Sequence, residues 1–158
     1  MVPSPALPAK WIAAPDYNRL LFLAVLLGER YCAVCNFLRF ELRRVMLCRP
    51  EDLPADVVAL RRWVTYRIGA GESQTKLLMY PEDGQSRGPA LPVTVPEGVA
   101  LIGLAVGSRM SFCTAAGEIS HVHVEAVGRP PLAAAPSTRR ELGVAVCGHD
   151  GSAVHTAA

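Results

Sequence analysis

The chain lacks an apolar segment long enough to cross a membrane. Its most hydrophobic run, LLFLAVLL from Leu20 to Leu27, is far shorter than the roughly 20 apolar residues that a membrane-spanning helix needs. The first residues, MVPSPALP, have neither the basic start nor the small-residue cleavage site of a secretory signal peptide. We therefore expect a cytoplasmic protein with no membrane anchor.

The chain also has little excess of positive over negative charge. The formal net charge is +2 over 158 residues, which is too small to create the field that draws a protein to nucleic acid. Six arginines do cluster between positions 39 and 62. That pattern is typical of a solvated helix face and strand edge, and a docking surface for an acidic partner is the alternative.

Cysteines and catalytic motifs are sparse. The five cysteines are odd in number and scattered, unlike the dense framework of a small secreted domain, which favours a reducing compartment. We find no phosphate-binding loop and no Ser-His-Asp order, and therefore expect no enzyme activity and no cofactor. Cys32 and Cys35 form a CxxC pair, and zinc would need two further ligands, such as His121 and His123. A metal-binding or redox protein is thus an alternative interpretation.

The two ends of the chain carry little periodic pattern. Residues 1–15 contain four prolines, and residues 129–158 are rich in Ala, Pro, Gly and Ser. We expect a flexible tail over 1–15 and a disordered tail over 129–158.

Between these ends, the first part of the chain has helical spacing. Asp16 is a candidate N-cap for a helix over Tyr17–Leu27, and a second helix is predicted over Cys35–Cys48. The short connection between them indicates an antiparallel helical hairpin over residues 16–49.

After Pro50 and Pro54, which cannot continue the second helix, the period of the apolar residues changes to two. A short helix is predicted from Pro96, because proline suits the first turn of a helix. Residues 50–128 therefore form a predicted α+β domain, an antiparallel sheet with one short helix. The expected extended segments are Val57–Ile68, Gln74–Tyr80, Pro92–Val95, Ser108–Thr114 and Glu118–Val127.

Residues 95–107 (VPEGVALIGLAVG) resemble the signature of a known domain. It is the FKBP-like C-terminal domain of the bacterial Gre transcript-cleavage factors. The stretches CRPEDLPADVV (48–58) and LLMYPED (77–83) make the chain still more similar to a short Gre relative, the regulator of nucleoside diphosphate kinase (Rnk). The resemblance covers about residues 35–128. The signature positions that match are Pro96, Gly98, Ala100, Leu101, Ile102 and Gly107.

The resemblance implies RNA polymerase as the partner. Gre factors dock on the rim of the polymerase secondary channel, so this chain would meet nucleic acid, DNA included, only indirectly through the polymerase. Three of the implied positions depart from the family pattern, because Val95, Glu97 and Ser108 replace other residue types there. The residues implied in docking are Val95, Pro96, Glu97, Gly98, Leu101 and Ser108.

The resemblance does not extend to transcript cleavage. Cleavage factors hold a metal ion between paired carboxylates at the tip of a long coiled coil, whereas this short hairpin would place Glu29 and Arg30 at its tip and Glu41 in mid-helix. We therefore expect no catalytic residue and no bound metal. A self-associating interaction protein is a further alternative, because the apolar helix over 20–27 offers a surface in the N-terminal hairpin.

Overall fold

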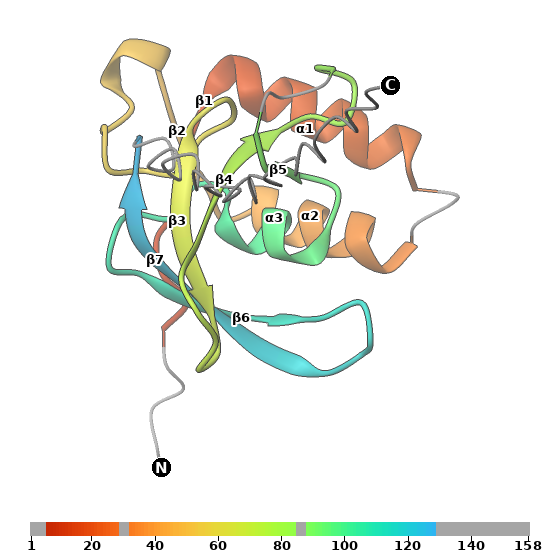
Figure 1. Ribbon diagram of the computed structural model, residues 1–158. Helices are drawn as coiled ribbons and strands as arrows, with labels where there is room; N and C mark the ends of the chain where they lie inside the picture. Colours follow the sequence, from red (N-terminus) through yellow and green to blue (C-terminus); the bar gives the residue numbers. More distant parts are fainter. Residues whose placement is uncertain (1–5, 29–31, 85–87, 129–158) are drawn as a thin grey trace, which may run out of the picture.

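The computed structural model describes residues 6–28, 32–84 and 88–128. Within them the chain has an α+β fold, in which a curled sheet and a short helix pack beside a pair of longer helices (Figure 1). In chain order the elements are β1 (Trp11–Ala13), α1 (Ala14–Leu26), α2 (Cys32–Leu42), β2 (Met46–Cys48), a 3-10 turn η1 (Pro50–Asp52), β3 (Trp63–Ile68), β4 (Gln74–Met79), β5 (Ala90–Pro92), α3 (Pro96–Leu101), β6 (Arg109–Cys113) and β7 (Ile119–Val127).

The main sheet has five strands in the order β5-β4-β3-β7-β6. Neighbouring strands are antiparallel except for β4 and β5, which are parallel because the chain crosses over between them. β1 and β2 form a separate parallel pair. The predicted α+β class is confirmed, with the addition that the sheet is mixed at one edge.

Buried and more accessible side chains alternate along the strands, so the sheet has a core face and a solvent face. Val64 and Tyr66 on β3 and Val122 and Val124 on β7 are fully buried or nearly so. The residues between them point to the other side of the sheet, since successive side chains of a strand face opposite ways. This two-residue period is the signal by which the sequence predicted the domain.

Helix α3 lies between the helical hairpin and the sheet, since it contacts α2 on one side and β6 and β7 on the other. One hydrophobic core joins all three layers, including Leu20 of α1, Leu38 of α2, Val99 of α3 and Val64 of β3. The predicted segments 16–49 and 50–128 therefore share a single core.

The predicted flexible tail over 1–15 needs correction in its second half. Residues 11–13 form β1, which pairs with β2 in the register Trp11↔Met46. The Trp11 N–H also donates to the Gly103 carbonyl oxygen at 2.9 Å. Long-range partners thus fix a segment that has no local pattern of its own. Residues 1–5 and the predicted tail 129–158 lie outside the described residues.

Both predicted helices of the hairpin begin and end at other residues than expected. α1 begins at Ala14, with Pro15 in its first turn, and its N-cap Ala13 makes no side-chain capping bond, so Asp16 is not the cap. α2 ends at Leu42, and residues 46–48 are extended because they pair with β1. None of the described helices is long and apolar enough to span a membrane.

The predicted strand over Val57–Ile68 forms only in its second half. Val57 and Val58 are buried, but they pair with the turn after α3, where the Val58 N–H donates to the Leu104 carbonyl oxygen at 2.8 Å. Arg61 then takes a positive φ of 62°, a value unusual for a non-glycine residue, and redirects the chain into β3. The period of two continues across this turn, so the sequence pattern could not reveal it.

Candidate docking surface around helix α3

Helix α3 is held against the sheet by a close backbone approach at Gly98. A Cβ atom at Gly98 would lie 2.3 Å from the Pro92 carbonyl oxygen and 2.9 Å from the Val93 Cα atom. Only glycine fits between these backbone atoms. Pro96 occupies the first turn, where its missing N–H is not needed. The small residue of the signature thus sets how closely the helix can pack on β5.

Val95, Pro96 and Glu97 are the accessible part of this segment. All three are half-buried at the N-terminal end of α3. Ser108 is also half-buried but lies beyond the C-terminal end of the helix, where its N–H donates to the Ala105 carbonyl oxygen. The structure therefore brings together three of the six predicted docking residues as one partly accessible segment.

Gly98 and Leu101 have a different role from the one predicted. Both are buried on the face of α3 that packs toward the sheet, and Leu101 has no exposed surface. The prediction that they contact a partner is corrected here, because residues three apart on a helix share a face and this face is the core. They support the surface from beneath.

Two apolar grooves flank Val95 and Pro96, and each has one wall from the helical hairpin. We call Val95, Pro96, Glu97 and these two grooves the α3 edge. One groove, of about 390 Å³, is lined by Leu23, Leu27, Pro81, Glu82, Thr94 and Val95. The other, of about 460 Å³, is lined by Ala33, Val34, Phe37, Pro96, Cys113, Thr114 and Ala115.

The stretch LLMYPED fixes helix α1 beside the first groove. Arg19 of α1 donates to Asp83 Oδ1 at 2.7 Å, and its guanidinium lies 3.8 Å from the centroid of the Tyr80 ring. The Tyr80 hydroxyl donates to the Asp16 carbonyl oxygen at 3.2 Å. The hydrogen bond from Arg19 lowers the pKa of Asp83, so the carboxylate stays ionised. This motif thus joins the hairpin to the sheet domain.

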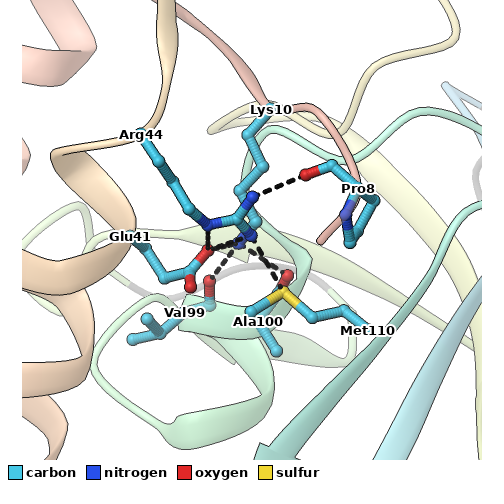
Figure 2. Close-up of polar contacts among 7 residues, drawn as sticks. All are labelled: Pro8, Lys10, Glu41, Arg44, Val99, Ala100 and Met110. Carbon is cyan, nitrogen blue, oxygen red and sulfur yellow. Dashed lines mark hydrogen bonds and ion pairs between the residues drawn. The ribbon is translucent and has the colours of Figure 1, made fainter. Parts of the chain in front are cut away.

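A buried ionic network supports α3 from the opposite end (Figure 2). Lys10 Nζ lies 2.8 Å from Glu41 Oε2, and both side chains are essentially inaccessible to solvent. Arg44 also contacts Glu41 Oε2, at 2.6 Å through Nη2, and its Nη1 donates to the Pro8 carbonyl oxygen. The network therefore connects the N-terminal segment to α2.

Lys10 also caps the C-terminal end of α3. Its ammonium group donates to the carbonyl oxygens of Val99 at 3.0 Å and Ala100 at 2.9 Å. The last carbonyls of a helix have no partner within the helix, and a cation is favourable at that end. Backbone N–H groups of Ile102 and Leu104 satisfy the Gly98 and Leu101 carbonyls. All four terminal carbonyls of α3 are therefore satisfied.

The sequence gives almost no indication of this network. Lys10 lies in a proline-rich stretch that we predicted to be a tail, and Glu41 and Arg44 have the spacing of an ordinary exposed helix pair. The only hint is that Glu41 follows the apolar positions Phe37 and Leu38 by four and three residues, which places it on their side of α2.

Lys10 should make stability depend on pH in an unusual direction. Burial lowers the pKa of Lys10 to about 8, although Glu41 opposes the shift. Between that value and the unfolded pKa of about 10.4, the unfolded chain binds more protons, so stability rises with pH. From pH 8 to 9.5 we expect a gain on the order of 1–2 kcal/mol, at 1.36 kcal/mol per unit.

Urea unfolding across this range, compared with the Lys10→Met variant, measures the effect, since other groups contribute equally to both proteins. Parallel pH profiles would contradict it. Above pH 10 the free energy of unfolding should fall again. Burial raises the pKa of Tyr66 to about 12, so the unfolded chain loses the phenol proton first and the folded state loses stability as the pH rises.

The metal and cleavage candidates that the structure describes do not come together. Glu29 and Arg30, the predicted hairpin tip, lie outside the described residues, and Glu41 is enclosed in the ionic network. Cys35 is buried in α2 on the core side of the sheet, whereas His121 and His123 lie on its outer face. Over the described ranges, no group of three or more His, Cys, Asp or Glu side chains could hold a metal ion.

Comparison with known proteins supports the resemblance. The chain is 33% identical over 102 residues to the regulator of nucleoside diphosphate kinase of Escherichia coli (strain K12), an alignment that covers 64% of this chain and 75% of that protein. The protein of the same name from Shigella flexneri matches with the same identity and coverage. No model of a known protein family matches the chain.

A solved structure shares the fold. The prokaryotic transcription elongation factor GreA/GreB from Nitrosomonas europaea superposes with a TM-score of 0.60 and 28% identity, over 76% of this chain and 99% of that one. On this sequence and fold evidence, the chain belongs to the Gre-like family of the regulator of nucleoside diphosphate kinase.

Proposed function

We propose that this protein is a transcription regulator that binds RNA polymerase near the secondary channel and does not stimulate transcript cleavage. The observation that carries the proposal is the α3 edge, where Val95 lines one apolar groove, Pro96 lines the other and Glu97 follows them at the start of the helix. Membership of a Gre-like family supports the polymerase as the partner.

The α3 edge has the composition of a docking surface. Apolar hollows accept anchor residues of a partner, and polar groups at the rim give orientation. Here the hollows are lined mostly by Leu, Val, Phe and Pro side chains, with Glu82 as the one charged residue in the lining of the first. The buried contacts of Gly98 and Lys10 keep the segment in place, which reduces the entropy lost on binding.

The expected lack of cleavage stimulation rests on the acids of the hairpin. A catalytic Mg²⁺ needs accessible carboxylate oxygens close together. Glu41 is 1% exposed and bound to Lys10 and Arg44, so it is not available to a metal ion at the tip. A transcript-cleavage assay on backtracked polymerase should show no acceleration by this protein.

The direct test is a pull-down with core RNA polymerase at low salt, with a Gre factor added as competitor. We expect retention that the competitor removes. No retention would refute the proposal, and retention unaffected by the competitor would show that binding lies away from the secondary channel.

Replacing Glu97 by alanine should weaken polymerase binding about fivefold or more without unfolding the protein. The carboxylate is half-buried at the start of α3, where an acid contributes only about 0.3–1 kcal/mol to helix stability. A fivefold loss corresponds to about 1 kcal/mol of binding free energy.

The measurement is a binding titration beside thermal melting curves. Glu51→Ala is the matched control, because it removes the same charge from an exposed turn elsewhere. Equal affinity of a folded Glu97→Ala protein and the control would remove Glu97 from the docking surface.

The solvent face of α1 supports self-association as a second candidate. Four apolar side chains that follow one another around this face are between 41% and 64% exposed: Leu21, Phe22, Val25 and Leu26. A continuous apolar surface on a helix is a common site of protein contact. Light scattering of the wild type and a Phe22→Ser variant distinguishes the cases, since a strict monomer at high concentration would refute self-association.

A further inference from the structure

The outer face of the main sheet carries a row of basic side chains from three strands. His123 on β7 is the direct cross-strand partner of Arg67 on β3 and of Arg109 on β6. In the next row, His121 is paired with Ser111. These residues lie on the side of the sheet away from α3, since they alternate with the buried Val122 and Met110.

The row borders a hollow of about 270 Å³. Its lining is made by Arg67, Arg109, His121 and His123 together with Gly69, Val122 and Glu125. Glu125 is the single acid among these lining residues. Two arginines and two histidines therefore face one carboxylate.

The single carboxylate is already neutralised. Arg67 Nη2 lies 3.0 Å from Glu125 Oε1, and Ser73 Oγ donates to Glu125 Oε2. The hydrogen bond from Ser73, with smaller contributions from Arg67 and His123, lowers the pKa of Glu125, so the acid remains ionised and occupied by Arg67. Arg109 makes no ion pair or side-chain hydrogen bond within the described residues. The positive charge that remains on this face is centred on Arg109 and the two imidazoles.

This arrangement favours a bound anion. Arg109 has no carboxylate partner within the described residues, so a bound anion would offset positive charge that this face leaves uncompensated. Neighbouring strands lie about 4.8 Å apart, which allows side chains from β6 and β7 to reach oxygens of one tetrahedral anion. Guanidinium and imidazolium groups are suitable donors to such oxygens.

We propose that Arg109, His121 and His123 form a binding site for a phosphate-type dianion, with an affinity that rises as the histidines are protonated. The groups that face these histidines are Arg67, Arg109, Glu125, Ser73 and Ser111. Because Arg67 and Glu125 compensate each other, the net charge of the site rises from about +1 with neutral histidines to about +3 with both protonated. The site is separate from the α3 edge and does not depend on polymerase binding.

Sulfate is the suitable first probe, because it is a dianion at every pH value of the titration. The full chain is titrated with sodium sulfate at constant ionic strength, and the imidazole Cε1–H signals are followed by NMR at about pH 6 and pH 8. We expect saturable shifts of the His121 and His123 signals, with an affinity about fivefold or more higher at pH 6. The signals are assigned from His121→Gln and His123→Gln variants.

Arg109→Gln should reduce the affinity for sulfate about tenfold. Arg49→Gln, which removes the same charge from an exposed position outside the sheet, should leave it unchanged. His123→Gln should weaken the pH dependence, because it removes one of the two histidine charges, and this second variant tests the site independently if Arg109→Gln melts at a lower temperature. Equal affinities at both pH values, or equal affinities of the Arg109→Gln and Arg49→Gln proteins, would overturn the proposal.

The source of the anion is separated by parallel titrations with inorganic phosphate and a short single-stranded oligonucleotide. Phosphate competing with sulfate for the same signals supports a small-anion site. Binding of the oligonucleotide alone, with no response to sulfate or phosphate, would overturn it in favour of a polynucleotide surface.

Discussion

Gly98→Ala is expected to destabilise the protein by about 3 kcal/mol or more. In an ordinary exposed helix the same substitution stabilises by roughly 0.5–1 kcal/mol, because alanine loses less conformational entropy than glycine. Here the added Cβ would lie 2.3 Å from the Pro92 carbonyl oxygen and 2.9 Å from the Val93 Cα. Both are backbone atoms, so α3 or β5 must shift, and overpacking of a closed core commonly costs about 1–3 kcal/mol or more.

The matched control is Gly107→Ala, which separates a steric clash from backbone strain. Gly107 has a φ of +85°, but a Cβ added there would meet no atom within 4 Å. The control should therefore lose only about 1–2 kcal/mol, from its left-handed conformation. Denaturant unfolding of both variants gives the comparison. Gly98→Ala as stable as the wild type would mean that α3 does not pack this closely on β5.

Breaking the Lys10–Glu41 pair from either side should be the other large effect. Removal of one partner of a buried ion pair commonly costs about 3–5 kcal/mol, because the remaining charge is left without compensation. Glu41→Ala would leave the Lys10 ammonium buried beside Arg44. Lys10→Met would leave Glu41 paired with Arg44 but would remove the donors to the buried Val99 and Ala100 carbonyls. We therefore expect losses of about 3–5 kcal/mol for each single variant.

A double-mutant cycle distinguishes the ion pair from simple loss of packing. In the Lys10→Met/Glu41→Leu protein neither partner of this pair is left buried alone, so its loss should be smaller than the sum of the Lys10→Met and Glu41→Leu losses by about 2 kcal/mol or more. Part of the cost should remain, because the α3 carbonyls still lack their cap. Additive losses in urea unfolding would show that the two side chains do not stabilise each other.

The two large effects involve Gly98 and Lys10, and the sequence indicates the structural role of only the first. Gly98 belongs to the signature, and its close approach gives a physical reason for a small residue at that position. Lys10 lies in a segment predicted to be flexible, and it proves to be wholly buried. A glycine within a helical pattern signals close packing, whereas a lysine near a chain end normally signals a solvated position.

The sequence alone determined the structural features that depend on residues close together along the chain. The two-residue period of β3 and β7, the helix beginning at Pro96 and the α+β class follow from local spacing, because burial of one face imposes that spacing. The signature was recognisable for the same reason, since its proline and glycines act on their own backbone.

Only the tertiary structure decided the features that need partners distant in sequence. Residues 11–13 and 46–48 become strands because they pair with each other, and Lys10 becomes a helix cap because the end of α3 lies beside it. Likewise Arg67, Arg109 and His123 form one row only because β3, β7 and β6 are neighbours in the sheet. The interaction energy of two groups depends on the distance between them in space, and that distance cannot be read from their positions along the chain.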